Sequence, residues 1–224
     1  MSPRRKTAPD DVIVQAAARV LARVGPAGFR LIDVADEVGL APATLIQRFA
    51  TKRNLLLAIA REGVAAVTRD FAARRARARS PLDALTEVRS SVCELAADPQ
   101  ALAHALAFHQ LGLTDREFRT IARRHQQALE REIGEILRAA IAAGELRRVA
   151  PAPLARAIVA LFRGSLLTWA FHRGTAPHAW IRQDLEVLLR PYRTPAARRA
   201  GAAPRPRAAR PPRRTRPRPA GEAK

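Results

Sequence analysis

Small and polar side chains that could meet a nucleic acid are grouped between residues 42 and 48, in the stretch PATLIQR. The side-chain amide of Gln47 can form two hydrogen bonds with an adenine, and Pro42 and Ala43 could contact the methyl group of a thymine. Thr51-Lys52-Arg53 follow almost directly and add positive charge of the kind that binds phosphates. The first chemistry that this sequence suggests is therefore recognition of a nucleic acid.

Residues that could carry catalysis are few. The chain has one cysteine, Cys93, and the five-residue spacing of His104 and His109 does not align them on one helical face for a metal. There is no glycine-rich phosphate loop, no His-Glu-x-x-His pair, no nucleophile elbow and no Cys-x-x-Cys. The sequence thus predicts neither an enzyme nor a bound metal or cofactor.

The composition indicates which elements must position these residues. Hydrophobic residues make up 48% of the chain and aromatic residues only 4%, with much Ala and Leu, which favours helices over sheet. We predict an all-α protein in which caps and apolar periodicity place about nine helices. The first should run from Asp10-Asp11 to Gly25-Pro26, and the others over 31–38, 42–49, 52–77, 81–97, 99–111, 114–144, 152–173 and 177–191.

The second and third of these helices form a helix-turn-helix pattern. Ala35 is small where the two helices must cross closely, and Gly39 suits a left-handed turn that a Cβ would hinder. With Leu45 and Phe49 turned inward, the rest of the third helix is left for the major groove of DNA. The outward residues are Pro42, Ala43, Thr44, Ile46, Gln47 and Arg48. A tight helical hairpin within a core is the alternative interpretation.

The stretch GPAGFRLIDVADEVGLAPATLIQRFATKRNLLLAIA resembles the N-terminal domain of the tetracycline-repressor (TetR) family of bacterial transcription regulators. In that family a preceding helix, the helix-turn-helix, an aromatic-Phe pair, a Lys and a Leu-rich fourth helix occur in this order, and residues 48–56 match the last portion. The resemblance is specific over residues 10–60 and looser beyond. It implies a transcriptional regulator, most commonly a repressor, that binds a palindromic operator as a homodimer and responds to a small apolar effector.

Three positions depart from the usual pattern of the family. Arg30 stands where Thr is usual, Ala43 where Gly is usual, and Ile46 where the hydroxyl of a Tyr usually touches phosphate. Because Ile46 cannot donate a hydrogen bond, we expect Arg30 or Arg48 to replace this contact electrostatically. Within the resemblance, Arg30, Thr44 and Lys52 are assigned to phosphates, and Gln47 is the main reader of bases.

The resemblance also implies how residues 57–192 are used, since the last two long helices of the family dimerise and the bundle before them binds the effector. Gly164 and Ser165 would let two helices approach closely. The expected interface residues are Ile158, Leu161, Phe162, Ser165, Leu166, Trp169, Ile181, Leu185 and Leu188. The candidate pocket residues, chosen by position alone, are Cys93, His104, Phe108, His109, Phe118 and His125. Each of these, taken singly, is more often a packing or surface residue.

The formal net charge of +20 is unevenly distributed. Residues 193–224 hold ten Arg and one Lys against one Glu, a net charge of +10, and cannot bury enough apolar surface to offset the entropy of ordering. We expect a disordered tail there and a flexible basic arm over residues 1–9, with the helix-turn-helix domain over 10–56. A polycation attracts any nucleic acid. A non-specific nucleic-acid or nucleoid-binding protein is therefore the alternative function. For the tail by itself, the alternative is an extension without a role, whose composition reflects biased codon usage.

Two features that the sequence lacks, a pair of cysteines and a long apolar segment, indicate the cellular compartment. A single cysteine excludes an intrachain disulfide and is consistent with a reducing compartment. The start MSPRRKTAPDD has charge but no apolar segment, and no stretch approaches eighteen uninterrupted apolar residues. We expect a soluble, cytoplasmic protein with no membrane partner.

Overall fold

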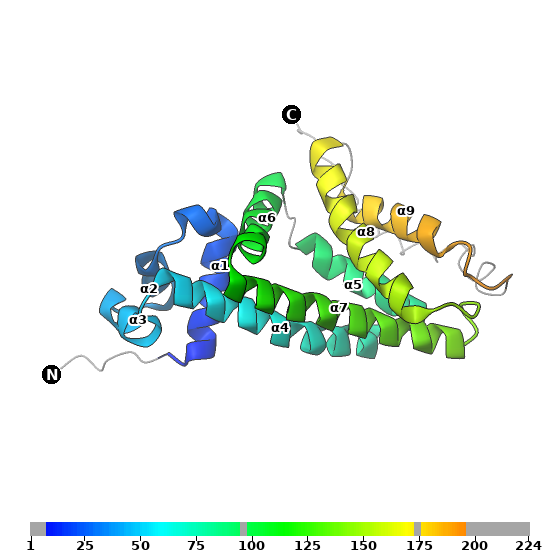
Figure 1. The fold of residues 1–224 in the computed structure, drawn as a ribbon, viewed down its shortest axis with the longest axis horizontal. Helices are drawn as coiled ribbons and strands as arrows, with labels where there is room; N and C mark the ends of the chain where they lie inside the picture. The colour runs from blue at the N-terminus through cyan, green and yellow to red at the C-terminus, as the bar shows by residue number, and fades with distance from the viewer. Residues whose placement is uncertain (1–7, 95–97, 173–175, 196–224) are drawn as a thin grey trace, which may run out of the picture.

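The structure is a computed structural model that describes residues 8–94, 98–172 and 176–195, with only the backbone course of residues 89–94. These residues form an elongated, all-α molecule (Figure 1). Its helices are α1 (Asp10–Gly28), α2 (Leu31–Val38), α3 (Pro42–Phe49), α4 (Lys52–Arg77), α5 (Pro81–Glu94), α6 (Pro99–Thr114), α7 (Arg116–Ala142), α8 (Pro151–His172) and α9 (Pro177–Leu189). The predicted fold class and helix order are confirmed.

The start of α7 differs from the predicted capping box. The cap is Asp115, whose carboxylate accepts from the backbone N–H groups of Glu117 (2.8 Å) and Phe118 (3.2 Å). Thr114 instead ends α6, and its hydroxyl donates to the carbonyl of Gln110 at 3.4 Å. The prediction was wrong by one residue because an aspartate accepts amide hydrogen bonds as well as a threonine and stands one place later.

Two hydrophobic clusters lie at opposite ends of the long helices α4 and α7, which run side by side (Figure 1). The first cluster contains side chains of α1, α2, α3 and the start of α4. It also contains Phe118 and Ile121 of α7. The second fills the body with side chains of α5, α7, α8 and α9. Beside the second cluster, Arg75 of α4 bonds to the buried Glu132 of α7 at 2.7 Å. The helix-turn-helix end is thus packed directly onto the body.

One described helix, α8, is long and apolar enough to cross a membrane. A helix in the core of a soluble protein meets the same two criteria, and 44% of the apolar stretch of α8 is buried inside this fold. Ile158 and Phe162 are among its buried side chains. Core packing accounts for part of the apolar character of α8.

The C-terminal part of α1 is kinked and held by α6. Gly25 has φ 68° and ψ 171°, a conformation essentially restricted to glycine, and Pro26 begins a short continuation to Gly28. The ring of His104 covers this kink, and its Nδ1 lies 2.9 Å from the carbonyl oxygen of Ala22. A Cβ built on Gly25 would lie 2.6 Å from His104 Cδ2. The expected helix end at Gly25-Pro26 is therefore a kink that carries a contact between α1 and α6.

We predict that Gly25→Ala destabilises the fold by about 3 kcal/mol, because it adds backbone strain and a clash with His104. The measurement is urea unfolding of the variant, of His104→Ala and of the double variant. The two single effects should not add, because removing the imidazole also removes the clash. Additive effects would contradict the contact described for His104.

Candidate nucleic-acid interface

The turn between α2 and α3 has the geometry that the helix-turn-helix pattern predicts. Gly39 adopts φ 66° and ψ 36°, the left-handed conformation that favours glycine. Its N–H bonds to the carbonyl of Asp36 at 3.2 Å, and the N–H of Leu40 to the carbonyl of Ala35 at 2.9 Å. Ala35 is fully buried, as close crossing of the helices requires. These bonds close the end of α2 and fix the direction in which α3 leaves.

Burial of one side of α3 leaves the opposite side at the surface. Leu45 is fully buried in the cluster that also contains side chains of α1, α2 and α4, and Phe49 packs partly against the same cluster. The predicted outward residues Pro42, Ala43, Ile46, Gln47 and Arg48 are exposed, and Thr44 is half-buried. Ile46 is 54% exposed, which is a large apolar surface for a side chain with no packing role. From Pro42 to Gln47 this surface is uncharged, so it is suited to base edges more than to phosphates.

The three cations predicted to approach DNA are all bonded to their own chain. Arg30 forms a two-bond pair with Asp33 (2.7 and 3.0 Å), and these hydrogen bonds hold the pKa of the Asp33 carboxyl below its usual value. Arg48 bonds to the carbonyl of Ala8 and, at 3.2 Å, to Asp10. Lys52 Nζ lies 3.3 Å from the carbonyl oxygen of Ala27. All three pairs are solvent-exposed, and such pairs are weak enough to exchange for a phosphate.

The link from α3 to α4 is a tight turn that the sequence did not reveal. Ala50 has φ 60° and ψ −48°, and the N–H of Thr51 bonds to the carbonyl of Phe49 at 2.7 Å, which is a classical γ-turn. Thr51 then caps α4 by accepting from the N–H of Asn54 at 3.1 Å. A non-glycine residue in this region is strained. The turn sets the angle at which α4 leaves the candidate DNA-binding helix.

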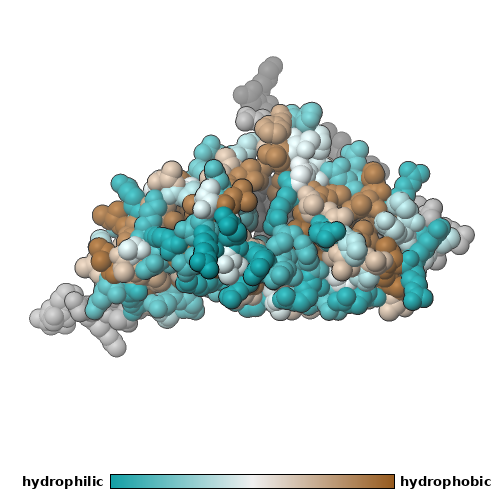
Figure 2. All heavy atoms as spheres, viewed as in Figure 1, coloured by the Kyte–Doolittle hydropathy of each residue, from teal (hydrophilic) through white to brown (hydrophobic). Residues whose placement is uncertain are grey.

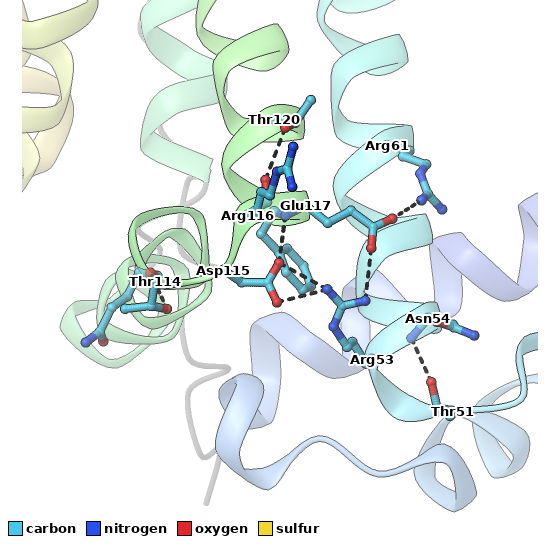
Figure 3. Close-up of polar contacts among 11 residues, drawn as sticks. Thr51, Arg53, Asn54, Arg61, Thr114, Asp115, Arg116, Glu117 and Thr120 are labelled. Atoms are coloured by element: carbon cyan, nitrogen blue, oxygen red, sulfur yellow. Dashed lines mark hydrogen bonds and ion pairs between the residues drawn. The ribbon is translucent and has the colours of Figure 1, made fainter.

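Arg53 connects the first turn of α4 to the start of α7, as Figure 3 shows. Its guanidinium bonds to both carboxylate oxygens of Asp115 (2.9 and 3.0 Å) and to Glu117 (3.0 Å), and it lies 5.7 Å above the ring of Phe118. Arg61 bonds to the other oxygen of Glu117 at 2.6 Å. The hydrogen bonds from Arg53 hold the pKa of Asp115 below its usual value. We call Arg53, Arg61, Asp115 and Glu117 together the Arg53 junction.

The surface around the Arg53 junction is polar and open. A cleft there is lined by Arg53, Arg61, Asp115, Arg116, Glu117, Thr120, Ile121 and Arg124. The face over α4 and α7 is mainly hydrophilic (Figure 2). Sequence analysis did not identify the junction, because Arg53 and Asp115 are 62 residues apart and no local signal connects them. It is a contact between the helix-turn-helix end and the body, placed beside the candidate DNA-binding helix.

The candidate pocket residues fall into separate places. Phe108 and Phe118 meet edge to face, with ring centroids 6.2 Å apart, in the cluster at the helix-turn-helix end. His109 and His125 lie with ring centroids 6.5 Å apart between α6 and α7. His104 faces α1, as described above, and the side chain of Cys93 lies outside the described residues. The structure thus brings together two pairs from α6 and α7 and does not gather the whole set.

Most of the expected interface residues pack inside the same chain. The buried ones are Ile158, Phe162, Ser165, Leu166, Trp169, Ile181 and Leu185, while Leu161 and Leu188 are partly buried. The Ser165 hydroxyl lies 2.5 Å from Asp184 and joins α8 to α9. The apolar side chains left exposed on these helices are instead Leu167 (41%), Phe171 (77%) and Val187 (67%). The apolar stripe predicted from the sequence therefore packs within this chain, and other apolar side chains of α8 and α9 are left exposed.

Residues 13–59 match bacterial regulatory proteins of the tetR family. A TetR transcription regulator from Haloarcula marismortui aligns with a TM-score of 0.68 at 17% identity, covering 82% of this chain and 97% of that one. FadR from Bacillus subtilis, in complex with stearoyl-CoA, aligns with a TM-score of 0.64 at 19% identity over 81% and 98%. SmeT, the repressor of the Stenotrophomonas maltophilia multidrug efflux pump SmeDEF, aligns with a TM-score of 0.62 at 19% identity over 89% and 98%. These likenesses show a shared fold, and none of the curated proteins compared with the chain matches it.

We expect the stability of the fold to depend on pH because of the histidine pair between α6 and α7. Burial, followed by the charges of His109 and Arg163, lowers the pKa of the half-buried His125 to about 4. The folded state therefore binds fewer protons than the unfolded chain, and stability is lost as pH falls from about 6.5 towards 4. For His125 this loss should amount to about 1–3 kcal/mol.

The measurement is the free energy of unfolding at pH 7.5 and pH 5.0 for the parent chain and for His125→Gln. The variant should lose less stability than the parent on acidification, because glutamine does not titrate. An equal loss in both proteins would show that His125 is not held neutral by its surroundings.

Proposed function

Because this chain carries, over residues 13–59, the N-terminal domain of the tetR family of bacterial regulatory proteins, we propose that it is a transcriptional repressor. It binds a palindromic DNA operator as a homodimer, and a small apolar effector changes its affinity for that operator. The observation that carries the proposal is the outer side of α3, which is exposed, uncharged up to Gln47 and held rigidly by the burial of Leu45. A cytoplasmic location belongs to the same proposal.

The roles of the candidate residues follow from their exposure. Gln47 reads bases in the major groove, and the apolar surfaces of Pro42, Ala43 and Ile46 contact thymine methyl groups. Arg30 and Lys52 exchange their exposed intramolecular bonds for phosphates, and Thr44 adds a hydroxyl. Arg48 keeps the start of α1 in place through Ala8 and Asp10.

Dimerisation is required by the size of α3. A helix of eight residues is about 12 Å long and reaches only a few base pairs, so specificity needs two copies on two half-sites. The proposed interface is centred on the exposed apolar side chains Leu167 and Phe171, which lie one turn apart on α8, and on Val187 of α9. Gly164 lies on the exposed side of α8 with open space where a Cβ would stand, which permits close approach of a partner helix. The two-fold pairing places one α3 on each half-site.

Effector control requires a ligand that prefers one orientation of the helix-turn-helix end relative to the body. The polar contacts that connect these parts include the Arg53 junction between α4 and α7, and His104 of α6 on the kink of α1. A ligand that moves α6 or α7 would therefore act on the DNA-binding end through polar contacts with defined geometry. FadR, one of the solved structures with the same fold, holds stearoyl-CoA, which supports an apolar effector here.

Non-specific binding is the second candidate function. It is favoured by the net charge of +10 over residues 193–224 and by Ile46, which cannot give α3 a hydrogen bond to phosphate. A specific regulator discriminates one sequence from others at fixed ionic strength, whereas a polycation has a steep salt dependence and little preference.

Selection of bound fragments from genomic DNA tests the proposed function, and we predict that an inverted repeat is enriched. On a duplex that contains the selected repeat, Gln47→Ala should weaken binding by about 1–3 kcal/mol and leave binding to an unrelated duplex nearly unchanged, because the amide contributes only to base recognition. Titrations of both duplexes at one salt concentration make the comparison. Equal weakening on the two duplexes would remove the base-reading role of Gln47.

For the interface, we predict that Phe171→Asp yields a folded monomer by sedimentation, because the substitution places a charge in the apolar contact. The 77% exposure of Phe171 means that the subunit itself should tolerate the change. Leu113→Asp is the matched control, since Leu113 is a 75% exposed apolar residue on α6, and it should leave the dimer intact. A dimeric Phe171→Asp protein would place the interface elsewhere.

A further inference from the structure

The cleft at the Arg53 junction holds more positive charge than its carboxylates balance. It has a volume of about 470 Å³ and lies between the N-terminal turns of α4 and of α7. Four arginines and two carboxylates line it, a net charge of +2: Arg53, Arg61, Arg116 and Arg124, with Asp115 and Glu117. Thr120 and the buried Ile121 complete the lining. A cleft of this volume falls within the range of small-molecule sites.

Two of the four arginines have no acidic partner. Among the described residues, no carboxylate forms an ion pair with Arg116 or Arg124, and both residues are exposed. They lie two turns apart on α7, with Thr120 between them, so they belong to the same side of the helix. Because the chain is rich in arginine, an exposed arginine alone would not mark a site. This pair is distinguished by lining one cleft together with Arg61 of the neighbouring helix.

The two carboxylates of the cleft are bonded in different ways (Figure 3). Asp115 accepts two hydrogen bonds from Arg53 and two from backbone N–H groups of α7. Glu117 accepts from Arg53 at 3.0 Å with one oxygen and from Arg61 at 2.6 Å with the other. The side chains of Arg61 and Glu117 are 58% and 43% exposed, and an ion pair this exposed is weak. Arg61 can therefore turn to another anion while Arg53 stays bonded to Asp115.

The arrangement of the arginines indicates the class of ligand. A guanidinium group binds phosphate oxygens through two parallel hydrogen bonds. Arg116 and Arg124 are about 12 Å apart along the axis of α7, and Arg61 faces the same cleft from α4. Guanidinium groups spread in this way fit several linked anionic groups better than one carboxylate or one phosphate. The volume of the cleft suits a small molecule and not a duplex.

We propose that this cleft binds a small molecule that carries two or more linked phosphates. The phosphates bond to Arg61, Arg116 and Arg124, and Arg61 leaves Glu117 to reach them. The site differs from that of the apolar effector, because its lining is mainly charged. Loss of the bond between Arg61 and Glu117 loosens the connection of α4 to α7 and so weakens operator binding by α3. This consequence for DNA rests on the proposed function.

Calorimetric titration of the full chain with inorganic tripolyphosphate tests the site, at neutral pH and about 150 mM NaCl to screen long-range attraction. Arg116→Gln/Arg124→Gln should bind about tenfold more weakly or worse, because two charge-assisted contacts are lost. The matched control is Arg123→Gln/Arg131→Gln, which removes two exposed arginines of α7 that do not line the cleft. The control should bind like the parent. The arginines of residues 193–224 are present in all three proteins, so their attraction for the anion does not affect the comparison.

The variant Glu117→Gln tests the exchange of Arg61. Removing the competing carboxylate should strengthen the binding of tripolyphosphate by about threefold or more. Its control is Glu135→Gln, because Glu135 pairs with Arg138 further along α7 and does not line the cleft. The control should leave the affinity unchanged, and thermal unfolding verifies that each variant is folded.

Two further anions define the class of ligand. Orthophosphate should bind the parent about tenfold more weakly than tripolyphosphate or worse, because a single phosphate reaches fewer arginines. Adenosine triphosphate separates the two sources of a linked phosphate. Tighter binding than tripolyphosphate indicates a nucleotide, equal or weaker binding indicates an inorganic polyphosphate, and either result supports the site.

The consequence for DNA is measured on the duplex that contains the selected repeat. At fixed ionic strength, tripolyphosphate should weaken operator binding by the parent about threefold more than operator binding by Arg116→Gln/Arg124→Gln. Equal weakening of the two proteins would overturn the regulatory consequence, because the anion would then act elsewhere.

The site itself would be overturned by equal affinity of Arg116→Gln/Arg124→Gln and its control for tripolyphosphate. Orthophosphate binding as tight as that of tripolyphosphate would overturn the class of ligand, and equal affinity of Glu117→Gln and Glu135→Gln would overturn the exchange of Arg61. Failure of the proposed function has a different signature: the chain without any added anion would not prefer the selected duplex over an unrelated one. The titrations with anions contain no DNA and do not depend on that preference.

Discussion

Burial of Leu45 in the hydrophobic cluster at the helix-turn-helix end is the constraint on which the rest of the candidate interface depends. A helix of eight residues has only one side to bury, and the apolar cluster at this end of the molecule takes the side that carries Leu45 and part of Phe49. The opposite side is then exposed to solvent, and no other feature of the fold is needed to expose it. This side carries Pro42, Ala43, Ile46 and Gln47. Gly39 and the γ-turn at Ala50 hold the two ends of α3, so the exposed side has a fixed direction. Recognition of bases needs this rigidity, because a hydrogen bond to a base edge tolerates little displacement.

The same cluster explains why events in the body can reach α3. Phe118 and Ile121 of α7 are buried in it, although both belong to a helix that extends through the body. Arg53 covers the ring of Phe118 and bonds to the cap of α7, so apolar packing and charge act at one place. His104 of α6 makes a second connection between the body and the helix-turn-helix end, through α1. A small movement of α6 or α7 would have to repack these contacts, and repacking is the physical basis on which we propose effector control.

Local signals accounted for most of what could be predicted from the sequence. Asp98 caps α6 and Thr51 caps α4, and Gly39 adopts the left-handed turn, because caps and turns depend on a few neighbouring residues. Partners distant in sequence could not be read in this way. Nothing near Arg48 identifies Ala8 as its acceptor, and nothing near Arg53 identifies Asp115.

The apolar stripe of α8 shows a further limit of the sequence. Periodicity correctly indicates a face that avoids water, but it does not distinguish the core of one subunit from the contact between two. Phe162 and Trp169 lie in the core of their own chain, whereas Phe171 is exposed two positions beyond Trp169. Only the packing of α8 against α7 and α9 separates these roles. The strain at Ala50 was equally invisible, because alanine gives no signal for a positive φ.

The central claim is that the exposed side of α3 touches DNA, and site-directed photocross-linking measures this contact most directly. A photoreactive phenylalanine analogue placed at Ile46, whose side chain is already exposed, should cross-link to a duplex that carries the selected site. The same analogue at Leu113 of α6 serves as the control for collisions with DNA and should give no cross-link. Absence of cross-linking from position 46, or equal cross-linking from both positions, would contradict the account.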